Sequence, residues 1–218
     1  MNTMRVFIIE APNPLELLSN QCEWRTLEQI CRLIGHEVSA MLVRSKDEFE
    51  TACSYIGSIE TPQGQRKRRY RDKTLILHIS AHGNQHGLGV GNDLLPWKDL
   101  FDGLRTIYKG TRYTGNRVIV ISACGARHQE LTTYFTQYHH RKPSKALPKY
   151  IFTAADETVD LPDLVVAWTI FYKELSNINL NHRKRVQNLL QRMKSGKFGN
   201  IIYHRWDNNK KKGSGLEK

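Results

Sequence analysis

The chain has 218 residues, 39% of them hydrophobic and 25% charged, which is enough to bury the core of one sizeable α/β domain and excludes a disordered polymer. A surplus of 33 Lys and Arg over 21 Asp and Glu gives a formal net charge of +12, which favours acidic partners and says nothing of the fold. No stretch approaches the roughly 18 apolar residues of a membrane span and no secretion leader is visible, so we expect a soluble, cytoplasmic protein without a membrane partner.

The first third of the chain alternates between strand and helix patterns. Arg5–Ile9 is an apolar run that predicts a strand, and apolar residues at helical spacing predict a helix over 21–35. Residues 36–45 then predict a second strand. Ser45 stands where its side chain can cap a helix over 46–59, whose first acidic residues suit the positive end of the helix dipole.

A polar segment interrupts this alternation. Residues 57–73 combine Pro62 and Gly64 with a cluster of Arg and Lys, so we expect an exposed basic insertion. The third strand follows over 74–80 as a nearly continuous apolar run. A glycine-rich stretch over 87–96 then predicts a small hairpin.

The second half of the chain repeats the alternation of strands and helices. Helical patterns predict helices over 97–110, 129–140, 161–175 and 181–194. Apolar runs predict strands over 117–123 and 200–206, and residues 149–157 predict a strand that enters an acidic loop. Such strands are typical of a parallel sheet covered on both faces. We therefore expect an α/β three-layer sandwich with a mainly parallel central sheet of about six strands, in one domain over 1–206 followed by a disordered basic tail over 207–218.

Two of the expected strands end in the same way. One runs into His82 and Gly83, and the next runs into Cys124. A cysteine thiol needs a base to become a nucleophilic thiolate at neutral pH, and imidazole is the usual base. Because ligands bind beyond the carboxyl ends of parallel strands, we expect His82 and Cys124 to form a catalytic dyad there. The backbone amides of Gly83 and Cys124 are natural oxyanion donors, since glycine lets a reacting carbonyl approach closely.

The other cysteines and histidines have simpler interpretations. The cysteines other than Cys124 are Cys22, Cys31 and Cys53. They lie among apolar residues without a CxxC pair, so we expect small buried side chains and no disulfides. His78, His82 and His86 are spaced by four residues, but the first lies inside a strand and the last lies well beyond its end, which disfavours a shared metal site.

The sequence resembles the caspase-like cysteine peptidases, and most of all their bacterial branch of CHAT and separase-like proteins. The resemblance rests on an apolar strand before His82-Gly83 and a second one before Ala123-Cys124-Gly125. The stretches 87–100 and 151–175 also resemble the hairpin and the later strand and helix of that branch. Ser122 stands where caspases have Gln and Ala126 where they have Gly, which argues against the caspases' preference for cleaving after Asp.

The resemblance implies a cysteine endopeptidase that needs no metal or organic cofactor. Cys124 would attack the peptide and His82 would act as acid and base. In relatives that cleave after Arg or Lys, an acidic residue forms the floor of the pocket, either two residues before the cysteine, where this chain has Ser122, or in the loop after the following strand. The acidic residues of that loop are Asp156, Glu157 and Asp160. Asp156 is the first candidate, and its alternative role is to cap a helix or turn.

Other functions fit parts of the sequence. The same fold could serve as a catalytically silent module that binds an acidic partner through its basic residues. The insertion at 57–73 could bind nucleic acid, yet no recognisable RNA or DNA module surrounds it, so a nucleic-acid ligand is disfavoured. It could also be cut by the peptidase itself. The resemblance places the protein in a defence or cell-death pathway, with a protein substrate and a regulatory partner that supplies activation.

Overall fold

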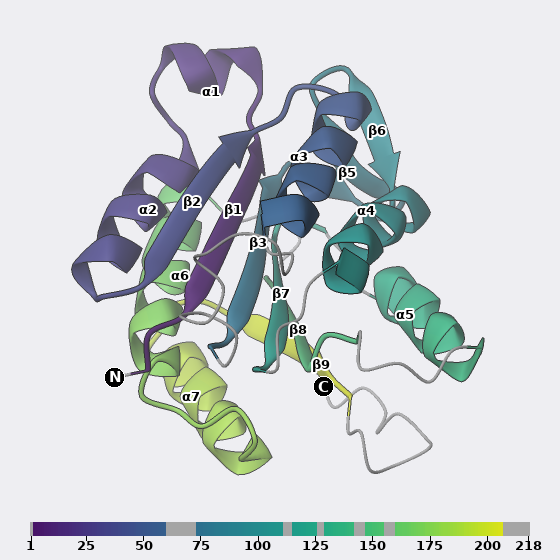
Figure 1. Ribbon diagram of the computed structural model, residues 1–218. Coiled ribbons are helices and arrows are strands. Elements are labelled where there is room, and N and C mark those ends of the chain that lie inside the picture. The colour runs from purple at the N-terminus through teal and green to yellow at the C-terminus, as the bar shows by residue number, and fades with distance from the viewer. Residues whose placement is uncertain are drawn as a thin grey trace.

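A six-stranded sheet forms the centre of the molecule (Figure 1). The computed structural model describes residues 2–59, 73–110, 115–125, 129–141, 147–154 and 160–206. In spatial order, the strands are β2 (Glu37–Leu42), β1 (Arg5–Ala11), β3 (Leu75–Ala81), β7 (Arg117–Ser122), β8 (Tyr150–Ala154) and β9 (Ile201–Arg205). The first five run parallel and β9 is antiparallel to β8. The prediction of a mainly parallel sheet of about six strands is confirmed.

Helices cover both faces of this sheet (Figure 1). One layer consists of α2 (Glu23–Leu33), α6 (Leu161–Leu175) and α7 (Arg183–Ser195), and the other of α3 (Lys46–Ile59), α4 (Trp97–Gly110) and α5 (Gln129–Arg141). Each layer encloses its own hydrophobic core against the sheet, one centred on buried side chains such as Phe49 and Leu104, the other on Leu27 and Trp168. The described residues therefore form the expected three-layer sandwich.

Four short elements lie at the carboxyl edge of the sheet. Helix α1 (Pro14–Leu18) follows β1, and the strands β4 (Gly83–Asn84), β5 (Gly87–Val90) and β6 (Asp93–Pro96) form a small antiparallel sheet after β3. The hairpin was expected from its glycines. Helix α1 was not expected, because five residues are too few to show helical periodicity.

The register of the sheet aligns three polar residues in one row. Glu10 of β1 pairs with Ser80 of β3, and Ser80 pairs with Ser122 of β7. The residues one step earlier in the same strands, which include Ile79 and Ile121, are buried and apolar. The sheet thus ends in a polar row at the edge where parallel strands offer a binding site.

Most of the helix ends predicted from the sequence agree with the structure. Helices α4 and α6 span the predicted ranges, and the Glu48 N–H donates to Ser45 Oγ at 3.1 Å, so Ser45 caps α3. Helix α3 continues to Ile59, so the first three residues of the insertion expected at 57–73 are helical. The rest of that insertion up to residue 72, and the tail at 207–218, lie outside the described residues. Among the described helices, none has the length and apolarity needed to cross a bilayer.

Candidate active site

The ends of β3 and β7 deliver His82 and Cys124 to one pocket. The two strands pair in parallel as far as Ser80 and Ser122, so the residues that follow them leave the sheet side by side. Both side chains line a pocket of about 190 Å³ at the carboxyl edge of the sheet. An imidazole and a thiol in one pocket are the two groups that acyl transfer by a cysteine requires.

The backbone at Gly83 packs directly against the end of β7. A Cβ atom on Gly83 would lie 2.8 Å from the carbonyl oxygen of Cys124 and 2.9 Å from Cβ of Ala123, so only glycine fits. The Gly89 N–H donates to the carbonyl oxygen of His82 at 2.8 Å. Because hydrogen-bonded and non-bonded pairs alternate in an antiparallel ladder, the next pair, Gly83 with Leu88, is a non-bonded one. The Gly83 N–H therefore points away from β5, as a donor to an oxyanion would.

The imidazole of His82 contacts helix α1 and the residue before it. Oε1 of Glu16 lies 2.7 Å from Nε2 of His82, and Nδ2 of Asn13 lies 3.3 Å from the same ring nitrogen. The side chain of His82 is 65% exposed. The ring is therefore oriented by its polar contacts with Asn13 and Glu16 and not by packing in a hydrophobic core.

A buried carboxylate lies beneath the pocket. Glu23, the first residue of α2, is fully buried and accepts hydrogen bonds from Ser80 Oγ at 2.6 Å and from Ser122 Oγ at 2.8 Å. Its Oε1 also lies 3.1 Å from Nε2 of the buried His78. The indole N–H of Trp168 donates to Ser122 Oγ at 2.8 Å, which ties α6 to the same network. These partners satisfy a carboxylate that would otherwise be costly to bury.

A second buried carboxylate, Glu10 of β1, is only 3% exposed. It accepts hydrogen bonds from the backbone N–H groups of Glu23 and Trp24 at the start of α2. Burial, together with the charge of Glu23, raises the pKa of Glu10 from 4.5 to about 7. The amides at the start of the helix oppose this shift only in part. Near neutral pH this carboxyl group is therefore divided between its protonated and ionised forms.

We expect the replacement Glu10→Gln to change how stability depends on pH. A carboxyl group whose pKa is raised on folding stabilises the protein below its unfolded pKa, and this contribution is lost as the pH rises through about 7. Between about pH 5 and pH 8, the free energy of unfolding should fall by about 2 kcal/mol more in the wild type than in Glu10→Gln. Urea denaturation of both proteins across this range measures the difference.

The exposed Glu50→Gln of α3 is the matched control for this comparison, because it removes a carboxylate that is not buried. Its pH dependence should follow that of the wild type. Parallel curves for Glu10→Gln and the wild type would contradict the raised pKa of Glu10.

The four cysteines differ in their exposure. Cys124 is partly exposed, whereas Cys22, Cys31 and Cys53 are buried, and none of the four is in a disulfide. Burial raises the pKa of Cys31 to about 12, and it raises the pKa values of Cys22 and Cys53 as well. The expectation that these three are small buried side chains is confirmed. Gly125 follows Cys124 with a φ of 59°, a left-handed conformation that favours glycine.

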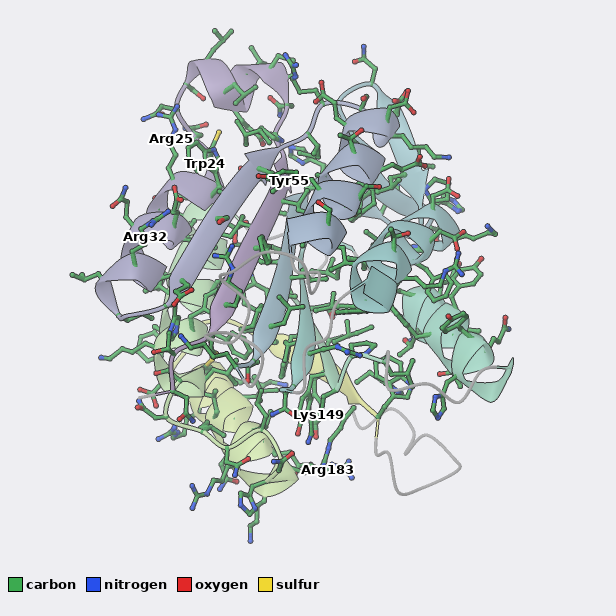
Figure 2. The ribbon with its side chains drawn as sticks, in the orientation of Figure 1. Trp24, Arg25, Arg32, Tyr55, Lys149 and Arg183 are labelled. Carbon is green, nitrogen blue, oxygen red and sulfur yellow. The ribbon has the colours of Figure 1, made fainter. Side chains whose placement is uncertain are left out.

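Acidic groups dominate the pocket. Its described lining includes the carboxylates Glu10, Glu16, Glu23 and Asp160, and none of its described lining residues is Lys or Arg. Figure 2 shows Lys149 and Arg183 at the opposite end of the sheet, near the amino ends of the strands, whereas Arg25 lies beside α1 without lining the pocket. The pocket is therefore acidic in a protein that is basic overall.

The structure places two of the four predicted substrate-binding residues at this pocket. Asp160 lines it from the N-cap position of α6, where its side chain makes no capping hydrogen bond. Ser122 lines it as well, although its hydroxyl is engaged with Glu23. Asp156 and Glu157 lie outside the described residues. Within the described ranges, no three His, Cys, Asp or Glu side chains are grouped to hold a metal ion.

Three carboxylates of the pocket were missed in the sequence patterns. Glu16 had a visible signal, since Asn13 followed by Glu16 has the spacing of a helix capping box. Glu10 ends an apolar strand, and a charge in that position marks a site at a sheet edge. Glu23 carried no such signal, because it reads as an ordinary acidic residue in the first turn of a helix.

The arrangement of this sheet and its helices is similar to that of a known structure. The crystal structure of drICE, a caspase, matches with a TM-score of 0.50 over 94% of this chain and 87% of that chain. The chain has a caspase-like fold. At 12% sequence identity, the caspase-like fold is all that this similarity shows. No protein-family model and no curated protein matches the sequence.

Proposed function

We propose that the protein is a cysteine endopeptidase. The observation that carries this proposal is that Cys124 and His82 line one pocket at the ends of adjacent parallel strands, on a caspase-like fold. His82 takes the thiol proton of Cys124, and the thiolate attacks the carbonyl carbon of the scissile peptide bond. The oxyanion that forms accepts hydrogen bonds from the amides of Gly83 and Cys124.

The rest of the reaction uses the same groups. The imidazolium of His82 gives its proton to the leaving amine, so the C–N bond breaks and an acyl-thioester remains on Cys124. His82 then takes a proton from water, which attacks the thioester. The carboxylic acid product leaves and the thiol is restored.

We propose that cleavage follows a basic residue of the substrate. A guanidinium or ammonium group fits a pocket that carries carboxylates and no described Lys or Arg. Glu23 is already occupied by Ser80, Ser122 and His78, both oxygens of the buried Glu10 accept backbone amides of α2, and Glu16 contacts His82. Among the described carboxylates of the pocket, this leaves Asp160 as the group that meets the cation. The planar, bidentate geometry of Arg suits paired carboxylate oxygens better than Lys does.

The setting of the activity is proposed from the resemblance to CHAT and separase-like proteins. The substrate is a dedicated protein target in a bacterial defence or cell-death pathway in the cytoplasm. A regulatory partner supplies activation. In the alternative proposal, the protein has the same fold but is a catalytically silent module that binds an acidic partner and does not hydrolyse peptides.

A panel of fluorogenic peptides tests the proposal. Peptides that differ only in Arg, Lys, Asp or Leu before the scissile bond are incubated with the purified protein, with and without candidate partner proteins. An Arg peptide carrying an acyloxymethyl ketone should label Cys124, and peptide mapping locates the adduct. Arg and Lys peptides should be cleaved and the others spared. A protein that neither cleaves any peptide nor reacts with the ketone under any condition is the silent module.

We expect Asp160→Asn to weaken cleavage after Arg. Loss of a charge-assisted hydrogen bond should lower kcat/KM for the Arg peptide by about 10- to 100-fold, because such bonds contribute about 1.5–3 kcal/mol. Cleavage of a peptide with a neutral residue before the bond should not fall. Asp163→Asn is the matched control, since Asp163 lies one turn further along α6 and outside the lining of this pocket. Equal losses for Arg and neutral peptides would contradict a role of Asp160 in specificity.

A further inference from the structure

The carboxylate of Glu16 is held by both of its oxygens. Oε2 accepts the backbone N–H of Asn13 at 2.7 Å, and Oε1 lies 2.7 Å from Nε2 of His82. In return, the backbone N–H of Glu16 donates to Oδ1 of Asn13 at 2.9 Å. This reciprocal capping box fixes the start of α1 and aims the free oxygen of Glu16 at the imidazole.

This contact determines which nitrogen of His82 carries the proton. A carboxylate can only accept hydrogen bonds, so Nε2 must be the donor and must bear the hydrogen. The lone pair of the neutral ring then lies on Nδ1, on the other side of the ring from Glu16. The Nδ2 of Asn13 is a donor and would favour the opposite tautomer, but it lies 3.3 Å from Nε2, whereas the charged carboxylate lies at 2.7 Å, so the contact with Glu16 is the stronger of the two.

We propose that Glu16 is a positioning residue that completes a Cys124-His82-Glu16 triad, and this rests on the proposed peptidase function. Glu16 holds the exposed imidazole with its Nδ1 lone pair available to take the proton of Cys124. It also stabilises the imidazolium that forms when the thiolate attacks. The β1–α2 connection thus supplies a side chain to the reaction.

The replacement Glu16→Gln separates orientation from capping. Glutamine also serves at this position of a capping box, because its Oε1 can accept the Asn13 N–H. Its amide nitrogen would then face Nε2 of His82 as a donor, which favours the tautomer with the proton on Nδ1. The unprotonated Nδ1 that should take the proton of Cys124 is thereby lost, while helix α1 keeps its cap.

The kinetic test uses the full-length protein with the best peptide of the panel. For Glu16→Gln we expect kcat to fall by about 100-fold or more and KM to stay within about twofold. The Tm should stay within about 2 °C of the wild type. Glu16→Asp, which keeps a carboxylate, should recover part of kcat. Glu28→Gln is the control, since it removes an α2 carboxylate that pairs with Arg32 away from the pocket.

A second readout does not depend on hydrolysis. In ¹⁵N-labelled protein at about pH 8, the ring nitrogens of His82 report the tautomer directly, and their signals are those that disappear in His82→Ala. The wild type should carry its proton on Nε2, and Glu16→Gln should shift it toward Nδ1. An unchanged tautomer, or wild-type kcat in Glu16→Gln, would overturn the triad. If the wild type cleaves nothing, the peptidase function fails and the tautomer measurement still decides the role of Glu16.

Discussion

We expect the replacement of Cys124 by alanine to lower kcat/KM for peptide hydrolysis by about 1,000-fold or more. The thiolate of Cys124 is the only group in the proposed reaction that forms a covalent bond to the substrate, so no other side chain of the pocket can substitute for it. Folding should be unaffected, because Cys124 is partly exposed and lies outside both hydrophobic cores. Initial rates with the Arg peptide, together with thermal unfolding, measure both effects.

His82→Ala should lower kcat/KM by about 100- to 10,000-fold, the range typical of general acid–base catalysis. The double replacement of Cys124 and His82 should be no slower than Cys124→Ala alone, because the two groups act as one unit. Additive losses would contradict a shared reaction.

Thiol labelling provides a control for this experiment. Iodoacetamide should modify the native protein once, at Cys124, since the other three thiols are buried and their pKa values are raised. In Cys124→Ala the native protein should not react, whereas the denatured chain should react at its remaining cysteines. Labelling of a buried cysteine in the native state would show that the cores open more readily than their packing indicates.

Replacing Gly83 by alanine should lower kcat/KM by about 100-fold. The added methyl group would meet the carbonyl oxygen of Cys124 at 2.8 Å and Cβ of Ala123 at 2.9 Å, and neither atom can be moved by rotating a side chain. The ends of β3 and β7 must therefore separate, and a shift of about 1 Å in a catalytic pair costs about 100-fold in rate. The free energy of unfolding should fall by about 1–3 kcal/mol. Initial rates and urea denaturation measure the two losses.

Gly89→Ala is the matched control from the same hairpin. A Cβ atom on Gly89 would meet its nearest neighbours, the carbonyl oxygen and Cβ of His82, at 3.7 and 3.8 Å, which is ordinary van der Waals contact. Its rate and stability should stay close to those of the wild type. If Gly83→Ala is as active as Gly89→Ala, this result would contradict the close packing of Gly83 against the end of β7.

Most of the fold could be predicted because its elements are long and strongly patterned. Helices α4 and α6 extend over 14 and 15 residues, so their apolar spacing shows both their existence and their bounds. The strands β3 and β7 are buried on both faces and read as continuous apolar runs. Helix α1 escaped prediction because five residues with no buried side chain leave no periodic signal.

The site could be predicted only in part. His82 and Cys124 were visible because each directly follows an apolar strand, a position that faces ligands in parallel sheets. The roles of Glu16 and Glu23 were not visible, because the residues that they contact lie far along the chain: Glu16 is 66 residues before His82, and Glu23 is 57 residues before Ser80. Propensity and periodicity describe neighbours in sequence and carry no information on such contacts.

The sequence by itself determined where the long strands and helices form, and that an imidazole and a thiol stand at the ends of two strands. Only the tertiary structure decided what surrounds them. The register that aligns Glu10 with Ser80 and Ser122, and the turn after β1 that brings Glu16 to His82, depend on how distant segments pack against one another. The physical reason is that local patterns reflect backbone preference and burial, whereas the chemistry of the pocket comes from side chains that meet only when the sheet has assembled.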